Sequence, residues 1–197
     1  MKVLALLLAA GQSRRFGEQD KRSVRMPDGG LLVNAMLRRL KKAGVEARVG
    51  IRRHDNIAPL LVGETIVCPR GQEGMGGTIA DMLNDVMTDS ALDAVMLMPA
   101  DLPLIRVSTL AALAASASPE RIVLPQCDGR QGHPVVFGRR FFPALSQLCG
   151  DRGGKAIITD HPECCDVIVV SDPGIYLDGD TPAAMAALLV QLSPKNR

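Results

Sequence analysis

Aromatic residues are scarce in this chain of 197 residues, which contains no tryptophan, one tyrosine and four phenylalanines. Hydrophobic residues still make up 47% of the sequence, so we expect an aliphatic core built from Leu, Val, Ala and Met. No repeat, linker or composition shift marks a boundary within the chain. The length therefore predicts one domain over residues 1–197.

Neither sign of charge predominates, because the chain has 23 basic and 21 acidic residues and a formal charge of +2. Such a balance argues against a nucleic-acid or membrane surface. The apolar start at residues 3–8 is too short to span a membrane, and no leader cleavage site follows it. The five cysteines are odd in number and lack Cys-x-x-Cys spacing, which favours reduced thiols in a cytoplasmic protein.

Two common nucleotide-binding fingerprints are missing. Neither Gly-x-Gly-x-x-Gly nor Gly-Lys-Ser/Thr occurs after the first apolar run, which argues against a Rossmann oxidoreductase and a P-loop protein. Instead, a buried strand predicted at residues 3–8 leads into a small-residue loop at residues 9–17. Backbone N–H groups of such a loop, with donors from Ser13, Arg15 and Lys21, suit a polyphosphate. The alternative is an ordinary strand-to-helix turn with solvated arginines.

Strand and helix patterns alternate along the rest of the chain. Strands are predicted at residues 3–8, 46–51, 65–68, 93–98, 121–124, 134–137 and 167–170. Helices are predicted at residues 31–43, 77–87, 107–117, 139–149, 154–159 and 181–192. This order indicates an α/β three-layer sandwich with a mostly parallel sheet. Ligands of such sheets bind at the carboxyl ends of the strands, so the loops that follow strands should carry the chemistry.

Carboxylates follow two of these strands. Asp101 comes just after a buried apolar strand, and it lies too far upstream of the next helix to cap it. Asp178 and Asp180 precede the last helix, where Asp180-Thr181-Pro182 also favours a helix N-cap. A hard cation such as Mg²⁺ prefers carboxylate oxygens together with substrate phosphates. A metal site is therefore predicted at Asp101.

The opening loop resembles a known motif. Leu8-Ala9-Ala10-Gly11-Gln12-Ser13-Arg14-Arg15-Phe16-Gly17 followed by Lys21 resembles the start of the molybdenum-cofactor nucleotidyltransferases, the MobA-like NTP transferases. The resemblance returns at later segments and covers most of the chain. It implies a Rossmann-like nucleotide-diphospho-sugar transferase fold. It also implies nucleotide contacts from Leu8, Ala9, Ala10, Gly11, Ser13, Arg15 and Lys21.

The later segments imply further roles. Asp101-Leu102-Pro103 is similar to the family's metal-binding Asp-x-Pro motif, and residues 178–182 are similar to its Asp-x-Asp-Thr-Pro stretch. By this resemblance Asp101 and Asp180 hold Mg²⁺, while Asp178 is assigned to the acceptor side. Residues 73–78 resemble a nucleotide-binding Gly-Met-x-x-Ser/Thr loop. The loop residues assigned to the nucleotide are Gly74, Met75, Gly76 and Thr78.

Two glycine-containing segments resemble walls of the acceptor site. They are Gly132-His133-Pro134 and residues 150–156, which assign His133, Arg152 and Lys155 to an anionic pterin phosphate. A histidine between glycine and proline also fits a purely structural role. One departure from the family is visible, because Arg22-Ser23 follow Lys21 where apolar residues are common.

The resemblance implies transfer of CMP from CTP to molybdopterin, with release of pyrophosphate and with Mg²⁺ as cofactor. Arg15 and Lys21 would neutralise the leaving pyrophosphate, and together with Asp101 they form the predicted catalytic set. The Ala10 methyl group would narrow the base slot in favour of a pyrimidine. The spacing of residues 17–21 instead resembles the guanosine-using branch.

The sequence leaves other functions open. They are a guanylyltransferase, a transferase to a sugar or alditol phosphate, and a non-catalytic nucleotide-binding or sensor protein on the same sheet. The carboxylates at two different loops favour an enzyme, because binding without turnover needs no such pair. A transient contact with molybdoenzymes or their maturation factors also follows from the resemblance.

Overall fold

The computed structural model of the protein describes residues 1–11, 16 and 20–192. Its strands are β1 (Val3–Leu8), β2 (Glu46–Ile51), β3 (Glu64–Val67), β4 (Ala94–Pro99), β5 (Ile122–Cys127), β6 (Arg130–Gln131), β7 (Val135–Gly138) and β8 (Cys165–Val169). Its α-helices are α1 (Leu32–Lys42), α2 (Met75–Val86), α3 (Val107–Ala115), α4 (Phe142–Ser146), α5 (Lys155–Asp160) and α6 (Pro182–Val190).

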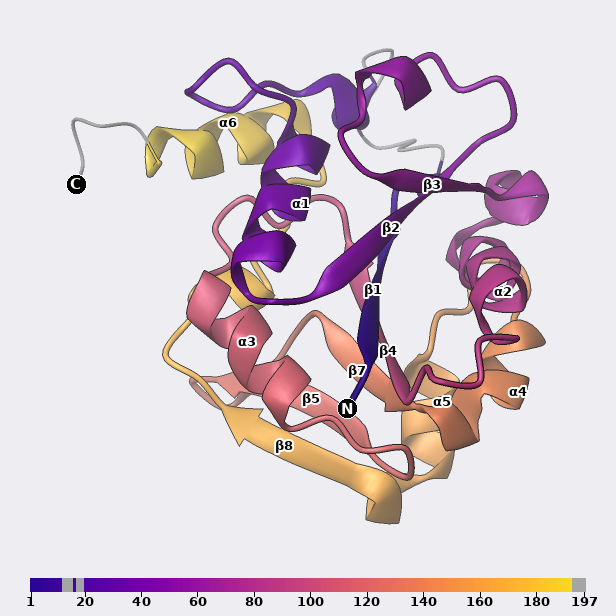
Figure 1. The fold of residues 1–197 in the computed structure, drawn as a ribbon. Coiled ribbons are helices and arrows are strands. Elements are labelled where there is room, and N and C mark those ends of the chain that lie inside the picture. Colours follow the sequence, from indigo (N-terminus) through magenta and orange to yellow (C-terminus); the bar gives the residue numbers. More distant parts are fainter. Residues whose placement is uncertain (12–15, 17–19, 193–197) are drawn as a thin grey trace.

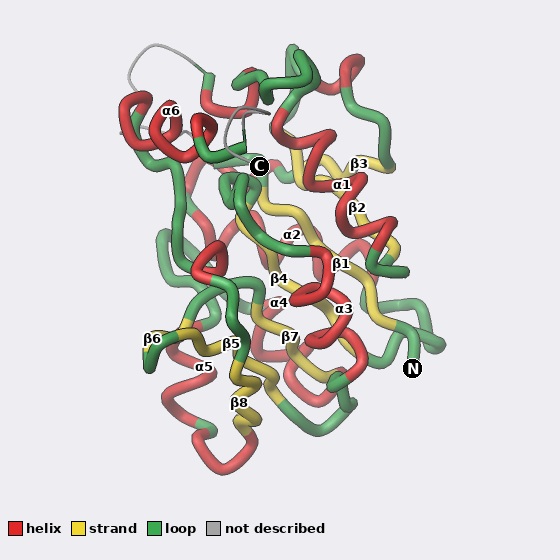
Figure 2. The backbone as a smooth tube through the Cα atoms, turned by 90° about the vertical axis from the view of Figure 1, so that its left-hand side faces the viewer, coloured by secondary structure: helices red, strands yellow, loops and turns green. Residues whose placement is uncertain are grey.

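One mixed sheet runs through the molecule in the order β3-β2-β1-β4-β7-β5-β6, and β8 pairs with β5 (Figure 2). Strands β3, β2, β1 and β4 are mutually parallel, as are β5 and β8. Strand β7 runs antiparallel to both β4 and β5, and it joins the two parallel parts of the sheet. The predicted α/β fold with a mostly parallel sheet is confirmed.

Helices cover both faces of the sheet and make three layers. Helices α1, α3 and α6 lie on one side, and α2, α4 and α5 lie on the other (Figure 1). Alternate residues of β1 serve the two faces, because Leu7 packs in the first core and Leu6 in the second. Both side chains are fully buried, and each such leucine contributes about 1.5–3 kcal/mol of transfer free energy. No helix in the described ranges has the length and apolar character needed to cross a membrane.

Two details of the chain differ from the sequence-based expectation. The helix predicted at residues 139–149 is replaced by a one-turn 3₁₀ helix, Arg139–Phe141, and the short α4. Pro143 lies in the first turn of α4, and its missing N–H group is tolerated only at a helix start. The hairpin strand β6 was not predicted, because Arg130 and Gln131 alone carry too short a pattern to indicate a strand.

The strand register brings the loops of the site together. Leu8, the last residue of β1, pairs with Pro99, the last residue of β4. The loops that leave these two strands therefore start side by side at the same edge of the sheet. One loop leads to Lys21 and the other leads to Asp101, although the two residues are 80 positions apart.

Candidate active site

Three carboxylates meet at this edge of the sheet, and they are called the carboxylate cluster below. Asp101, Asp178 and Asp180 each offer one oxygen atom, and these atoms lie within 4.8 Å of one another. Asp101 follows β4, whereas the other two come from the loop before α6. The two loops are clipped together because the Gly179 N–H donates to the Asp101 carbonyl at 3.1 Å. The structure thus unites the carboxylates that the sequence placed at separate loops.

Lys21 supplies the positive charge of the cluster. Its ammonium group donates to Asp101 Oδ2, and it donates to Asp180 Oδ1 at 3.1 Å. The Lys21 side chain is only 11% exposed, so these ion pairs lie in a partly desolvated setting. Asp101 Oδ1 is also buried, and it accepts no hydrogen bond from the described residues. Lys21 therefore satisfies one oxygen of Asp101 and leaves the other available to a ligand.

Local structure fixes the loop that carries Asp178 and Asp180. Thr181 caps α6, since its hydroxyl oxygen accepts from the Ala184 N–H at 3.2 Å, and Pro182 occupies the first turn. Upstream, the buried Asp172 accepts from the Arg106 N–H and from the Thr109 hydroxyl group. The predicted N-cap is confirmed, with Thr181 as the capping residue. Both ends of the loop are held, which orients its carboxylates.

Electrostatics differ within the cluster. Burial raises the pKa of Asp178 above its ordinary value, and the nearby charges of Asp180 and Asp101 raise it further, against the opposing effect of Lys21. Desolvation lowers the pKa of His133, although Asp101 and Asp178 act in the opposite direction. A histidine with a lowered pKa is neutral at pH 7. The side chain of His133 thus adds no fixed positive charge beside the carboxylates.

Two cavities adjoin the cluster. The smaller, about 120 Å³, is lined by Leu8, Ala9, Gly11, Lys21, Arg22, Met75, Pro99, Ala100 and Asp101. The larger, about 500 Å³, lies between β5, β7 and α5, and its lining includes His133, Lys155 and Asp178. Leu8, Met75 and Pro99 border both cavities, which makes them neighbours. One cavity thus contacts Lys21 and Asp101, and the other contacts Asp178.

The loop before α2 supports the site mainly through its backbone. Gly74 has φ of +132°, and a Cβ atom there would lie 2.2 Å from Asp151 Oδ1, so the position needs glycine. The Gly76 N–H donates to the Gly150 carbonyl at 2.8 Å, which ties this loop to residues 149–154. Thr78 is buried and its hydroxyl group donates to the Gly74 carbonyl at 3.3 Å. The Thr78 hydroxyl group thus already has a partner in this loop, and its contact with the nucleotide stays a prediction.

Ala10 also differs from its predicted role. Its side chain is fully buried, and a Cβ atom added at Gly71 would lie only 2.7 Å from the Ala10 methyl group. The methyl group packs against the backbone of residues 69–73 and does not project into an open slot. The proposed steric reason for choosing a pyrimidine is thus corrected, because the Ala10 side chain cannot touch a bound base directly.

The residues assigned to the acceptor are only partly brought together. His133 and Lys155 both line the larger cavity, and their contact with an acceptor stays a prediction. Arg152 is exposed on the loop that packs over Gly76 and stays a prediction. The sequence did not point to Arg130, whose guanidinium group stacks 4.5 Å from the centre of the Tyr176 ring beside this cavity. Ser13 and Arg15 lie outside the described residues, so their roles also stay predictions.

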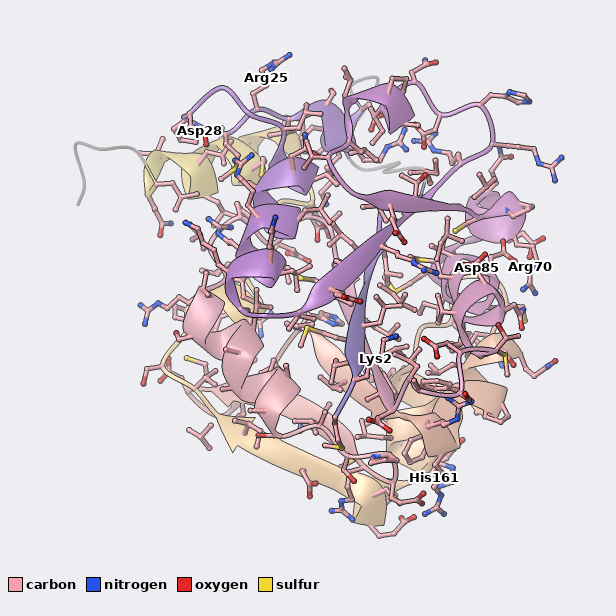
Figure 3. All side chains as sticks on the ribbon, in the orientation of Figure 1. Lys2, Arg25, Asp28, Arg70, Asp85 and His161 are labelled. Atoms are coloured by element: carbon pink, nitrogen blue, oxygen red, sulfur yellow. The ribbon has the colours of Figure 1, made fainter. Side chains whose placement is uncertain are left out.

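A larger cavity, about 910 Å³, lies at the opposite end of the sheet and holds none of the predicted site residues. Its lining includes Lys2 and Asp85, both labelled in Figure 3. Several of its charged groups are already paired, since Lys2 pairs with Asp89 at 2.9 Å and Arg48 pairs with Asp85 at 3.2 Å. Size alone therefore does not identify the functional cavity.

Comparisons with known proteins show the family and the fold. Residues 5–165 match the MobA-like NTP transferase domain. A molybdenum cofactor guanylyltransferase of Vibrio cholerae is 28% identical over 189 residues, which cover 92% of this chain and 88% of that protein. A Mycobacterium sp. strain JC1 homologue of Mycobacterium tuberculosis Rv0371c superposes with a TM-score of 0.83 at 26% identity, covering 98% of this chain and 100% of that one.

A manganese complex of Mycobacterium tuberculosis Rv0371c shares the fold at a TM-score of 0.77 and 21% identity, covering 96% of this chain and 99% of that one. The family match spans well over half of the sequence and includes most of β1, all of β4 and Asp101. The chain therefore belongs to the MobA-like NTP transferase family, and it is a nucleotidyltransferase.

Proposed function

We propose that the protein transfers a nucleoside monophosphate from a nucleoside triphosphate to a molybdopterin-type acceptor and releases pyrophosphate. The observation that carries the proposal is the carboxylate cluster with Lys21, set beside two adjoining cavities. An acceptor phosphate oxygen attacks the α-phosphorus, and the bond from that phosphorus to the pyrophosphate oxygen breaks. Such a transfer needs positioning and charge neutralisation more than a strong general base.

The donor atoms fit a divalent cation such as Mg²⁺. Asp101 has a buried oxygen atom with no hydrogen-bond donor among the described residues, and Asp180 and Asp178 add oxygens within 4.8 Å. Hard cations prefer such carboxylate oxygens. We assign Asp101 and Asp180 as the residues that would hold the metal, with Asp178 beside them. A bound Mg²⁺ would supply Lewis-acid stabilisation of the charge on the triphosphate.

Residues of the chain supply the remaining positioning. Lys21 lines the smaller cavity and bridges two carboxylates, so it balances their charge and can also contact phosphate oxygens. Arg15 is proposed to add a second cation from the preceding loop. Leu8, Met75 and Pro99 form the boundary between the cavities, and apolar walls there would keep water from the reacting atoms.

The larger cavity suits the acceptor. Lys155 offers an exposed ammonium group for an acceptor phosphate, and neutral His133 offers a hydrogen-bonding edge. The Arg130–Tyr176 stack provides a flat surface at the same cavity, which suits a planar ring system. We therefore place the acceptor over β5–β7 and the triphosphate over β1 and β4. The protein would act in the cytoplasm, where its free cysteines stay reduced.

CTP and GTP are the two candidate donors. The Leu8-Ala9-Ala10-Gly11 segment resembles the cytidine-using branch, and on that basis we propose CTP. GTP is the second candidate because the Vibrio cholerae relative is named a guanylyltransferase. Since Ala10 is fully buried, selection of the base would fall to backbone groups around the smaller cavity.

The test is pyrophosphate release with CTP, GTP and ATP, each supplied with Mg²⁺ and molybdopterin, with the Asp101→Asn variant as control. Product formation with CTP at the highest kcat/KM is expected. A higher kcat/KM with GTP would reassign the donor and leave the transferase intact. Nucleotide binding without pyrophosphate release, whichever acceptor is supplied, would instead favour a non-catalytic sensor protein with the same fold.

A further inference from the structure

Arg22 directly follows Lys21 in the sequence, and the structure buries its side chain. Its side chain is 7% exposed, and its guanidinium group contacts two carboxylates, Asp20 and Asp55. Arg22 Nε donates to Asp20 Oδ1 at 2.8 Å, and Nη1 donates to Asp55 Oδ2. These three residues are called the Arg22 cluster below. Arg52 lies outside this cluster but 3.8 Å from Asp20, and its positive charge offsets the second carboxylate.

The Arg22 cluster ties together three segments that surround Lys21. Asp20 caps the one-turn 3₁₀ helix Lys21–Ser23, since its side chain accepts from the Arg22 N–H at 3.0 Å. Asp55 belongs to the loop after β2 and accepts from the Arg52 N–H at 2.9 Å. Arg22 Nη1 also donates to the Ala9 carbonyl at 3.3 Å, at the start of the opening loop.

A buried ion pair is weak evidence for stability, because desolvation offsets much of its Coulombic attraction. Burial by itself would lower the pKa of Arg22, but the hydrogen bonds that it donates to Asp20 and Asp55 raise this pKa overall, so the group stays charged. A planar guanidinium group with fixed donors gives orientation that an apolar side chain cannot give. Lys21 directly precedes Arg22, and it donates to Asp101 and Asp180 from this anchored turn.

We propose that Arg22 is a positioning residue that acts through Lys21, by fixing the turn Lys21–Ser23 against Ala9 and Asp55. Arg22 borders the smaller cavity, but its guanidinium group donates to Asp20, Asp55 and the Ala9 carbonyl, so in this scheme it touches no reacting atom. The inference rests on the proposed role of Lys21 in the transfer reaction.

The test is a double-mutant cycle in the full-length protein with Arg22→Met, Lys21→Ala and both together. Arg22→Met should lower kcat by about 10- to 100-fold with a smaller change in KM, because a displacement of about 1 Å can have such an effect. In the Lys21→Ala background the same change should alter kcat by less than about 2-fold, since the two residues act as a unit. Equal effects of Arg22→Met in both backgrounds would overturn the proposal.

Two further variants keep the test independent of folding defects. Asp20→Ala removes the more exposed partner of Arg22, since the Asp20 side chain is 34% exposed. This variant should also lower kcat more than it changes KM. Arg121→Met is the matched control, because Arg121 pairs with Asp166 through two nitrogen atoms between β5 and β8. The control should keep wild-type kcat, and a loss equal to that of Arg22→Met would count against a positioning role.

Hydrogen exchange separates this proposal from the proposed function. The Ser23 and Val24 amides donate to the Asp20 and Lys21 carbonyls, so they report directly on the turn. In Arg22→Met these two amides should exchange about 10-fold faster while the core strands stay protected. Unchanged exchange would overturn the positioning role even if the wild-type protein transferred no nucleotide. Absent turnover with faster exchange would overturn only the proposed function.

Discussion

Lys21 and Arg22 are neighbours in the sequence, and each contacts two carboxylates, yet the two clusters differ in how fully their oxygen atoms are used. Asp55 has a completely buried side chain, and both of its oxygens accept hydrogen bonds, from Arg22, Arg52 and Ile57. Asp101 has a buried oxygen that accepts none from the described residues. The saturated cluster holds the chain together, and the unsaturated one is open to a ligand.

Asp101→Asn breaks the unsaturated cluster and should have the largest effect on activity. Removing one anionic metal ligand should raise the transition-state free energy by several kcal/mol, on the order of a 10³-fold loss in kcat. Thermal stability should fall only slightly, because the amide oxygen of the variant can still accept from Lys21, which also keeps its ion pair with Asp180. The measurement is pyrophosphate release at saturating Mg²⁺. A kcat near the wild-type value would show that Asp101 is not a metal ligand.

Asp55→Ala breaks the saturated cluster and should act on stability. Leaving Arg22 buried without one of its two carboxylates should lower the free energy of unfolding by about 3–5 kcal/mol. Urea denaturation followed by circular dichroism measures this change. The control is Asp166→Ala, which removes a pair whose side chains are 36% and 42% exposed. That control should lose less than about 1 kcal/mol, and an equal loss in both variants would contradict the comparison.

Lys21→Ala removes the ammonium group that pairs with the carboxylate cluster and lines the smaller cavity. A charge-assisted contact to polyphosphate contributes about 1.5–3 kcal/mol, so kcat/KM should fall by about 10- to 150-fold. Arg15→Ala should act in the same direction. Without Lys21, the three carboxylates repel one another more strongly, so Mg²⁺ alone should raise the melting temperature more than it does in the wild-type protein. Unchanged kinetics in both variants would mean that the opening loop does not contact the triphosphate.

The pH dependence of stability should have opposite signs in the two clusters. Burial would raise the pKa of Asp20 and Asp55, but hydrogen bonds with Arg22 lower both below the ordinary value of 3.8. Their stabilisation is therefore present above that value and is lost as pH falls through their lower folded-state pKa. Burial and the neighbouring Asp180 and Asp101 instead raise the pKa of Asp178. Its unfavourable contribution is present above the folded-state pKa and is relieved as pH falls.

Asp178→Asn tests the predicted pH dependence of stability in the carboxylate cluster. Its effect should be the smallest of these variants, because Asp178 is exposed. The variant should melt at a slightly higher temperature than the wild type at pH 7 without metal. The difference should shrink as pH falls through the raised pKa of Asp178 toward its ordinary value of 3.8. Calorimetry at a series of pH values measures it, and a difference that grows toward acid would contradict the assigned repulsion.

Local patterns in the sequence determined most of the architecture. The predicted strand at residues 46–51 is β2, and the helix predicted at residues 31–43 is α1 within one residue at each end. Gly44, two residues beyond the end of α1, has φ of +75°, which glycine adopts without strain. These features depend on side-chain period and backbone preference over a few residues, so they are visible without the fold.

Only the tertiary structure decided which charged side chains meet. Lys21 reaches Asp180 across 159 residues, and Arg22 reaches Asp55 across 33, because separate loops converge at one edge of the sheet. The sequence predicted a phosphate ligand at Lys21 and assigned no role to Arg22. The burial of Ala10 against Gly71 was likewise decided by packing between β1 and residues 69–73. Side-chain type limits the possible chemistry, whereas the long-range contacts determine which carboxylate keeps an oxygen free for it.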